Sequence, residues 1–309
     1  MPYFHVVFTV PEPIAAIAFQ NKRVVYDILF QATADTLRTI AADSRHLGAT
    51  LGFIAILHTW GQTLVHHPHL HCVVPGGGLP LDGKRWVACR PGFFLPVQIL
   101  SRLFRRLFLA RLKDTFDAGA LRFFSSLAHL AEPDAFLRYL ADSRCTEWVV
   151  YAKEPFGGPR QVLDYLGRYT HRVAISNNRL LELTDEQVTF RWKDYRHPAK
   201  PRAMSLPAHE FIRRFLLHVL PRGFQRIRHY GLLSNRLRER GLADCRRLLE
   251  APPHPREVRH SPEVDYRDRY EKLTGRSLLA CPVCSRGRML CIERLLPGAS
   301  PWAPPGRIA

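Results

Sequence analysis

The sequence predicts a mixed fold of the α+β class, in which strands and helices both contribute to one core. Residues 3–10 alternate in polarity and are rich in aromatic and β-branched residues, a strand pattern that Pro11 and Pro13 end. Residues 14–46 and 97–142 repeat apolar residues every three or four positions, as helices do. Two apolar runs at 51–60 and 69–74 flank a turn and predict a β-hairpin.

The composition is that of a globular chain with a large excess of positive charge. Its 309 residues include 45 Lys and Arg against 27 Asp and Glu, a formal net charge of +18. Such an excess favours a polyanionic partner, and nucleic acid is the first candidate. No apolar run is long enough to span a bilayer and the N-terminus lacks signal-peptide features, so we expect no membrane partner and a cytosolic location. Seven cysteines, an odd number, fit reduced thiols in that compartment.

The chain is expected to divide near residue 250. Residues 1–250 form the main domain, in which 97–142 are a helical insertion, and residues 251–309 form a tail rich in Pro and Arg. Further strands are predicted at 85–89, 147–153, 173–176, 180–183 and 188–192, and further helices at 160–169 and 207–220. Residues 222–247 contain eight arginines and only two acidic residues, which predicts a basic helical region that binds phosphates.

The stretch 57–78 concentrates histidines and predicts a metal site. His69 and His71 are separated by one residue, and alternate side chains of a strand share a face, so both imidazoles point at one spot. Gln62 lies across the predicted turn, where its amide oxygen is a candidate third ligand. A lone histidine on a half-buried strand is more often a hydrogen-bonded core residue, and the pair weakens that alternative. Nitrogen and oxygen ligands without thiolate favour Mg²⁺ or Mn²⁺ over a closed zinc site, although imidazoles also bind zinc, nickel or copper. The other histidines of the stretch are expected to lie around the ligands or at the surface: His58, His66 and His67.

Tyr165 and Tyr169 are candidate nucleophiles. Residues four apart on a helix share a face, so both phenols can serve one site. The alternative is a pair that packs on the sheet. Basic neighbours favour catalysis, because a phenol attacks as an oxyanion and nearby positive charge stabilises that form. Those neighbours include Arg168, His171 and Arg172.

A histidine pair, a tyrosine pair and a basic surface together indicate a site that nicks DNA covalently. The metal polarises a non-bridging oxygen of the scissile phosphate, and a tyrosine displaces the 3′-hydroxyl in line. The product is a 5′-phosphotyrosine, which keeps the bond energy, so that rejoining needs no nucleotide cofactor. The arginines expected to bind the DNA are Arg168, Arg172, Arg222, Arg226, Arg228 and Arg236.

Two weaker motifs remain. Residues 78–84 match a phosphate-binding loop up to Lys84, but Arg85 stands where that loop needs Ser or Thr, and a strand follows in place of a helix. Nucleotide binding is therefore not expected. In the tail, Cys281 and Cys284 have the spacing of half a zinc site, with completions available from Cys291, His254 and His260. This pair is as consistent with a vestige as with a zinc knuckle.

Four motifs give the chain a resemblance to a known family. PYFHVVFT from Pro2, HPHLHCVVPGGG from His67, RYTHRVAISN from Arg168 and GFQRIRHYG from Gly223 resemble the two-tyrosine rolling-circle transposases of the HUH endonuclease superfamily, the family of insertion sequence ninety-one and the common-region elements. The resemblance covers residues 2–247. It implies a central antiparallel sheet with flanking helices, His69 and His71 as metal ligands, and Tyr165 and Tyr169 as nucleophiles.

The same resemblance implies the partner and the place of action. The partner is single-stranded DNA, at the transposon ends and at the target, and the location is the bacterial cytosol or nucleoid. Related nickases carry a third metal ligand where Gln62 stands. The family's zinc-ribbon domain precedes the PYFH strand, at which this sequence begins, so either an N-terminally truncated copy or a reading from a late start is expected.

Three other functions stay open on the sequence. A rolling-circle replication initiator or a relaxase would use the same chemistry. A non-catalytic DNA-binding protein would use the histidines to hold a structural zinc. A metal phosphodiesterase would use water and leave a free 5′-phosphate. The function that the resemblance implies is that of a transposase, which nicks and joins single-stranded DNA through a 5′-phosphotyrosine in rolling-circle transposition. Formation of a covalent adduct between a tyrosine and DNA separates this function from the last two.

Overall fold

A computed structural model describes residues 1–156, 161–162, 167, 174–194, 202–251, 266–275, 277–281, 284 and 286–289. The chain divides into two compact units, Met1–Ala251 and Pro252–Ala309. The larger unit contains the sheet, its helices and the main core. Within the described residues, no helix is long and apolar enough to cross a membrane.

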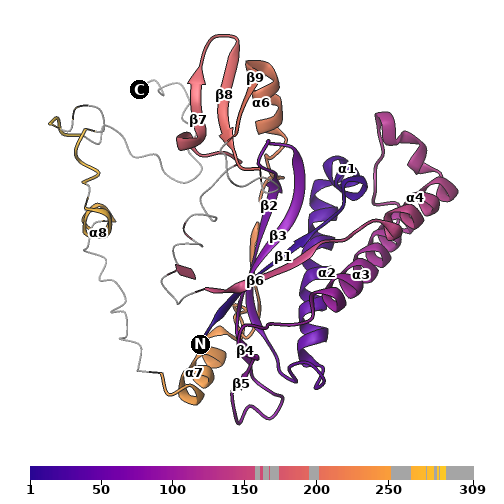
Figure 1. The fold of residues 1–309 in the computed structure, drawn as a ribbon, viewed down its shortest axis with the longest axis vertical. Coiled ribbons are helices and arrows are strands. Elements are labelled where there is room, and N and C mark those ends of the chain that lie inside the picture. The colour runs from indigo at the N-terminus through magenta and orange to yellow at the C-terminus, as the bar shows by residue number, and fades with distance from the viewer. Residues whose placement is uncertain are drawn as a thin grey trace, which may run out of the picture. The chain divides into compact units, whose positions relative to one another are not determined.

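The larger unit is built on a five-stranded antiparallel sheet with the order β10-β2-β3-β1-β6 (Figure 1). The strands are β1 (Tyr3–Thr9), β2 (Gly52–Trp60), β3 (His66–Pro75), β6 (Val150–Phe156) and β10 (Ile227–Gly231). All four pairings are antiparallel. The predicted α+β class with an antiparallel sheet is thus confirmed.

Strand alternation gives this sheet one apolar face and one polar face. Leu70 of β3 lies between Phe8 of β1 and Leu57 of β2, and all three side chains are buried. The neighbouring positions point the other way, and there His69 lies between Thr9 and His58. The sequence pattern with period two therefore separates the core from the candidate site.

Helices cover the apolar face (Figure 1). They are α1 (Glu12–Gln20), α2 (Lys22–Ala42), α3 (Val97–Asp117) and α4 (Pro133–Cys145), with a 3₁₀ helix at Ser125–Ala131. Phe104 and Phe108 of α3 are fully buried and pack against Trp148, and Phe104 also contacts Phe8 of the sheet. The predicted insertion 97–142 is therefore part of the main core. Gly119, at φ 68°, follows the end of α3, because the left-handed conformation that closes the helix favours glycine.

A small sheet forms a second cluster within the same unit. Its strands β7 (Leu180–Leu183), β8 (Gln187–Trp192) and β9 (Arg202–Pro207) pair in that order, and α6 (Ala208–Leu216) follows β9. Phe190 and Leu206 are buried there with Leu64, which belongs to the turn between β2 and β3. The small sheet thus packs against the tip of the hairpin that carries the histidines. Two short strands, β4 (Gly77–Gly78) and β5 (Val87–Ala88), form a separate pair.

Several predicted elements differ from the structure. The basic region 222–247 was expected to be helical, but its first part is β10, which pairs with the edge of β2, and only α7 (Arg238–Leu248) is helical. Strand β9 was not predicted, and residues 174–176 form no strand.

The helical stretch 97–142 is interrupted after α3, because Gly119 ends that helix and Pro133 begins the next. The predicted helix at 160–169 lies largely outside the described residues. In the smaller unit, α8 (Tyr266–Thr274) precedes the cysteine pair.

Candidate metal centre

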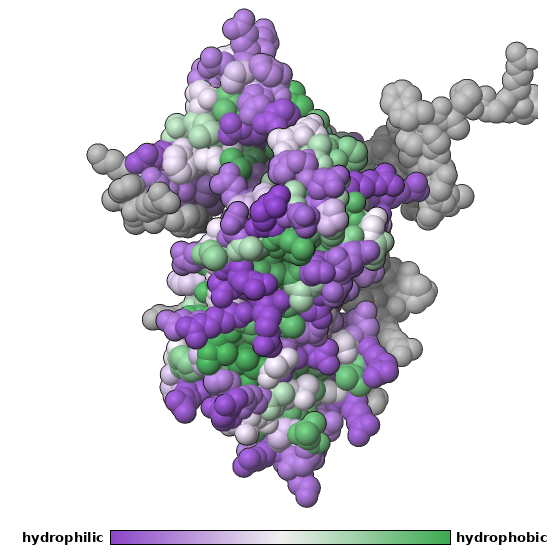
Figure 2. Space-filling view, turned by 90° about the vertical axis from the view of Figure 1, so that its right-hand side faces the viewer, coloured by the Kyte–Doolittle hydropathy of each residue, from purple (hydrophilic) through white to green (hydrophobic). Residues whose placement is uncertain are grey.

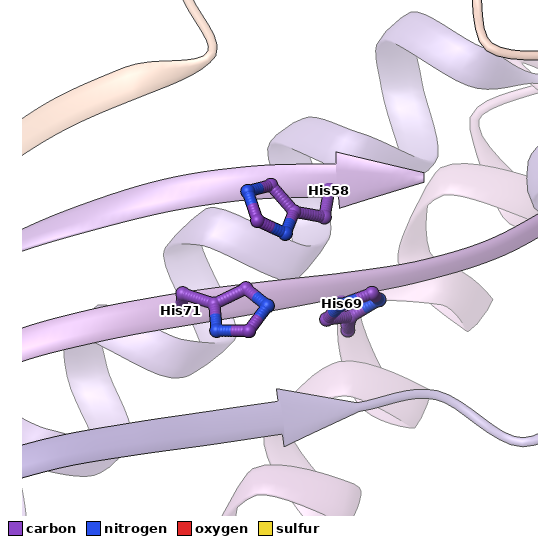
Figure 3. Close-up of side chains that lie close together, drawn as sticks. All are labelled: His58, His69 and His71. Carbon is purple, nitrogen blue, oxygen red and sulfur yellow. The ribbon is translucent and has the colours of Figure 1, made fainter. Parts of the chain in front are cut away.

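Three histidines converge on the polar face of the sheet (Figure 3). His58, His69 and His71 each offer one ring nitrogen, and these nitrogens lie within 4.8 Å of one another. The ring centroid of His71 is 4.2 Å from that of His58 and 4.8 Å from that of His69. Three imidazoles at this separation are a donor set that fits one divalent cation.

The strand register brings the three rings together. His58 of β2 lies directly opposite His69 of β3, and His71 is two residues further along β3 on the same face. His58 is buried at 2% exposure and its ring stacks on Trp60 at 4.6 Å. The aromatic contact and the sheet hold this imidazole in place.

Hydrogen bonds orient the two β3 imidazoles. Nδ1 of His69 lies 2.7 Å from the carbonyl oxygen of His67, and because a carbonyl only accepts, Nδ1 carries the proton. Nε2 of His69 then has its lone pair free for a metal. Nδ1 of His71 lies 2.7 Å from Nε2 of His5, a buried residue of β1 that stacks on His71. Such outer partners fix the tautomer of a ligating histidine.

Burial keeps His69 of the centre neutral. Burial lowers the pKa of His69 to about 4, and nearby His67 acts in the same direction. Burial also lowers the pKa of His67. A neutral imidazole is the form that binds metals, so at neutral pH His69 needs no deprotonation before it binds a cation.

The centre opens into a cavity of about 750 Å³. One wall is made by β1, β2 and β3, and the other by the end of β8 and the start of β9. Lys193 and Arg202 contribute positive charge to that second wall, and Arg202 pairs with Asp194 at 3.3 Å. The cavity therefore places cationic side chains opposite the imidazoles.

The structure brings some of the predicted site residues together and does not describe others. His69 and His71 share one face and come together as the sequence predicted. His58, which the sequence predicts to lie around the ligands or at the surface, is instead buried within the same cluster. Gln62 lines the same cavity, where its side-chain oxygen accepts a hydrogen bond from the Lys193 amide at 3.4 Å. Its role as a ligand stays a prediction. The predicted nucleophiles Tyr165 and Tyr169 lie outside the described residues, as do Arg168 and Arg172.

The described arginines of the basic region differ in their surroundings. Arg228 pairs with Asp27 of α2, and its guanidinium lies 4.1 Å from the ring centroid of Phe30. Burial lowers the pKa of Arg226, which is partly buried beside β2. Arg222 and Arg236 are exposed. Of the four predicted DNA-binding arginines that the structure describes, these two are the ones in position to meet a ligand from solvent.

In the smaller unit, Cys281 and Cys284 lie next to a short turn. Sγ of Cys284 accepts a hydrogen bond from the Gly287 amide at 3.3 Å, and the Cys281 amide donates to the Gly287 carbonyl at 2.8 Å. Backbone hydrogen bonds from Gly287 and Arg286, together with one from the Cys281 side chain, lower the pKa of Cys284. The three candidates for the remaining ligands of this site, Cys291, His254 and His260, lie outside the described residues.

Comparison with known proteins finds relatives over most of the chain. Residues 52–240 match the family model Y2_Tnp, described as "Putative transposase". "Putative transposase y4qJ" of Sinorhizobium fredii (strain NBRC 101917 / NGR234) is 66% identical over 292 residues, which are 94% of this chain and 73% of that protein. "Transposase for insertion sequence element IS801" of Pseudomonas savastanoi pv. phaseolicola is 28% identical over 240 residues, which are 76% of this chain and 55% of that protein.

Among solved structures, complexes of the conjugative relaxase TrwC with DNA resemble this chain distantly. One of these complexes holds a 27-mer DNA comprising the recognition hairpin and the cleavage site. Its TrwC chain is 12% identical to this chain, the match covers 79% of this chain and 73% of the TrwC chain, and the TM-score is 0.29. A metal-free complex with OriT DNA is 13% identical, covers 81% of this chain and 74% of its own, and gives a TM-score of 0.29. A TM-score this low does not establish a shared arrangement.

Proposed function

Because this chain belongs to the transposase family that its residues 52–240 match, we propose that it cuts and rejoins single-stranded DNA at the cavity beside His58, His69 and His71. The observation that carries the proposal is the imidazole cluster, which faces cationic side chains across a cavity. A phosphodiester needs both features, since its bridging phosphate is an anion that must be held and polarised.

His58, His69 and His71 would hold a divalent ion. The fit rests on the orientation of His69, whose Nε2 lone pair is left free by the Nδ1 hydrogen bond, and on the common separation of the three donors. When bound, the ion supplies Lewis-acid polarisation of a non-bridging phosphate oxygen. Mg²⁺ and Mn²⁺ were the ions expected with Gln62 as ligand. A set of three imidazoles favours Mn²⁺ of the two, because Mg²⁺ prefers oxygen ligands.

The residues of the second wall would position the phosphate. Lys193 and Arg202 supply charge on the side away from the histidines. Asp194 orients Arg202 through their ion pair and leaves part of the guanidinium available, since that group has five N–H donors. Held between the imidazoles and this wall, the scissile phosphate exposes its phosphorus to a nucleophile.

Tyr165 and Tyr169 are the proposed nucleophiles. The phenol oxygen of one tyrosine forms a bond to phosphorus, the bond from phosphorus to the 3′-oxygen breaks, and the leaving 3′-oxygen takes a proton. The 5′ end stays attached as a phosphotyrosine. Attack of another 3′-hydroxyl reverses the step and releases the tyrosine, so two tyrosines allow a second cut while the first is occupied.

The proposal is tested with a labelled single-stranded oligonucleotide from the element's end, incubated with the protein and Mn²⁺. We expect a covalent adduct that survives denaturation, with mass spectrometry locating it on Tyr165 or Tyr169. Each of Tyr165→Phe and Tyr169→Phe should retain some nicking, and the double variant should form no adduct. Cleavage by the double variant that leaves a free 5′-phosphate would indicate a hydrolase that uses water.

A second comparison tests the metal centre itself. His58→Ala should lose cleavage by more than a hundredfold, as His69→Ala and His71→Ala should, while His129→Ala serves as the control on an exposed 3₁₀ helix. DNA affinity in EDTA should remain largely unchanged in all four variants. If His58→Ala cleaves normally and Gln62→Ala does not, the third ligand is Gln62.

The cysteine pair of the smaller unit is proposed as half of a zinc site. The amide hydrogen bond to Cys284 and its lowered pKa favour the thiolate, which is the form that binds zinc. We expect the purified protein to contain zinc that is lost in Cys281→Ser with Cys284→Ser. Cys145→Ser, at an exposed position of the larger unit, is the control. Equal zinc contents in all three proteins would exclude the site.

A further inference from the structure

A basic groove lies between α3 and α4, away from the metal centre. Its volume is about 600 Å³ and its positive side chains come from both helices. None of the described residues that line it is acidic. Leu109, Leu137 and Leu140 form an apolar floor, and Leu137 is 45% exposed. The cationic residues of the groove are Arg102, Arg105, Arg106, Lys113 and Arg144.

The charge of this groove differs from that of an ordinary solvated helix face. On such faces cations usually meet carboxylates, as Lys113 does with Asp117 at 2.5 Å. Arg102 and Arg106 are exposed, and within the described residues neither forms an ion pair. Arg105 is held by the carbonyl of Arg144 at 2.9 Å. Of the groove's cations, Arg102 and Arg106 therefore have no ion-pair partner among the described residues, whereas Lys113 pairs with Asp117.

Two intermediate hollows lie between the groove and the metal cavity. The metal cavity shares Thr9 and His67 with a hollow of about 730 Å³ beside α1. That hollow shares Glu147 and Val149 with a smaller one of about 380 Å³ at the start of β6. The smaller hollow shares Arg102 and Arg105 with the groove. Each depression thus shares wall residues with the next, so the four lie one after another along the surface, and this series is called the track.

The lining of the track changes along its length, and its middle also includes the carboxylates Glu12 and Glu147. Its two ends, at Lys193 and Arg202 and at the groove, are cationic. Its middle, beside α1, is mainly apolar, and there Phe19 and Val65 are 44% and 54% exposed. Apolar hollows bordered by hydrophilic side chains lie on the face that carries α1, α3 and α4 (Figure 2). Stacking surfaces between cationic sites are the features that bind a single strand.

We propose that a single strand of DNA runs from the metal cavity, past Phe19, into the groove between α3 and α4, where Arg102 and Arg106 bind its phosphates. The proposal rests on the proposed function for the position of the scissile phosphate. It adds a second binding surface, which binds the segment of the strand on one side of the cleavage position. That segment therefore stays bound to the protein after cleavage, while the cut end is free to be joined to another strand.

The test measures binding of single strands in EDTA, so that cleavage does not intervene. Oligonucleotides share one cleavage position and are lengthened separately on the 5′ or the 3′ side. For the unaltered protein we expect affinity to rise with length on one side only, which gives the polarity of the track. For Arg102→Gln with Arg106→Gln this gain should be reduced, and the log–log salt slope for the long strand should fall by about 1.4, or about 0.7 for each phosphate contact.

Lys84→Gln with Arg85→Gln is the matched control, because it removes the same charge at two exposed positions outside the track. The control should keep the salt slope of the unaltered protein. The proposal is wrong if the salt slope falls equally in both double variants, or if it falls in neither. It is also wrong if a duplex of the same length binds as tightly as the single strand. Adduct formation by the unaltered protein is measured in parallel. If no adduct forms, the proposed function is rejected. The salt slopes still show whether the groove binds single-stranded DNA.

Discussion

At the scale of residues, the metal centre shows what a strand pattern can and cannot predict. The spacing of His69 and His71 is sufficient to place both on one face, because the side-chain period of a strand is fixed. His58 belongs to the preceding strand, and its place opposite His69 depends on the register of the hairpin. That register includes an irregularity between His58 and Trp60, which no sequence pattern indicates.

His5 is expected to act on the metal through His71. It does not belong to the ligand cluster, but its Nε2 is the hydrogen-bond partner of His71 Nδ1 at 2.7 Å. His5→Leu should therefore weaken Mn²⁺ binding by about 10- to 100-fold, because His71 loses the group that fixes its tautomer. Titration calorimetry measures the affinity, with His129→Leu as the control. Unchanged affinity would mean that the His5 ring is required only for packing.

At the scale of elements, tertiary contacts decided where local patterns could not. Residues 227–231 are dense in arginine and histidine, yet they form β10 because their backbone pairs with the open edge of β2. Propensity describes a segment alone and gives no information about a distant edge that needs a partner. The same limitation explains the missed strand β9, which pairs with β8. By contrast, long apolar repeats predicted α2 and α3 correctly, because their periodicity reports burial directly.

Arg228 is expected to contribute to folding more than to DNA binding. It joins β10 to α2 through Asp27 and lies over Phe30. Arg228→Met should lower the free energy of unfolding by about 1 kcal/mol, the scale of a partly exposed ion pair with a cation–π contact. Asp27→Asn should have a similar effect, and the double variant should lose less than the sum of the two single changes. Urea unfolding measures all three proteins.

Arg236→Gln is the matched comparison, since Arg236 is exposed. This variant should unfold as the unaltered protein does and should bind single strands with a smaller salt slope. If Arg228→Met reduces the slope while its stability is unchanged, Arg228 contacts DNA as the sequence first suggested.

At the scale of the whole molecule, several buried histidines that stay neutral make the fold sensitive to acid. Burial lowers the pKa of His218 and of His66 to about 4 from an ordinary 6.5. The unfolded chain therefore binds more protons than the folded one between these values. Stability is fully present above pH 6.5 and falls as the pH drops toward 4, by up to about 1.4 kcal/mol per pH unit for the buried His218.

Urea unfolding in EDTA between pH 7.5 and 4.5 measures this dependence. His218→Gln should make the dependence of stability on pH less steep, because the glutamine amide replaces one of the groups that titrate. His129→Gln should leave it unchanged, since His129 is exposed. A pH dependence that is identical in all three proteins would assign the acid sensitivity to other groups.

The whole molecule also shows the limit of sequence reasoning about the nucleophiles. The spacing of Tyr165 and Tyr169 and their basic neighbours predict a pair of nucleophiles, but the distance of these tyrosines from the histidines follows from no sequence pattern. The composition was more informative, because a net charge of +18 predicted a polyanionic partner and the chain belongs to a transposase family.

The placement of all three histidines on one hairpin has a consequence for folding kinetics. His58, His69 and His71 lie within a short segment, so bringing them together closes a small loop and fixes little chain entropy. Pairing of β10 with β2 instead joins residues that are far apart in the sequence, so it closes a much longer loop and fixes more chain entropy. The ligand cluster is therefore among the first parts of the sheet that the chain can assemble, and the basic edge strand is among the last.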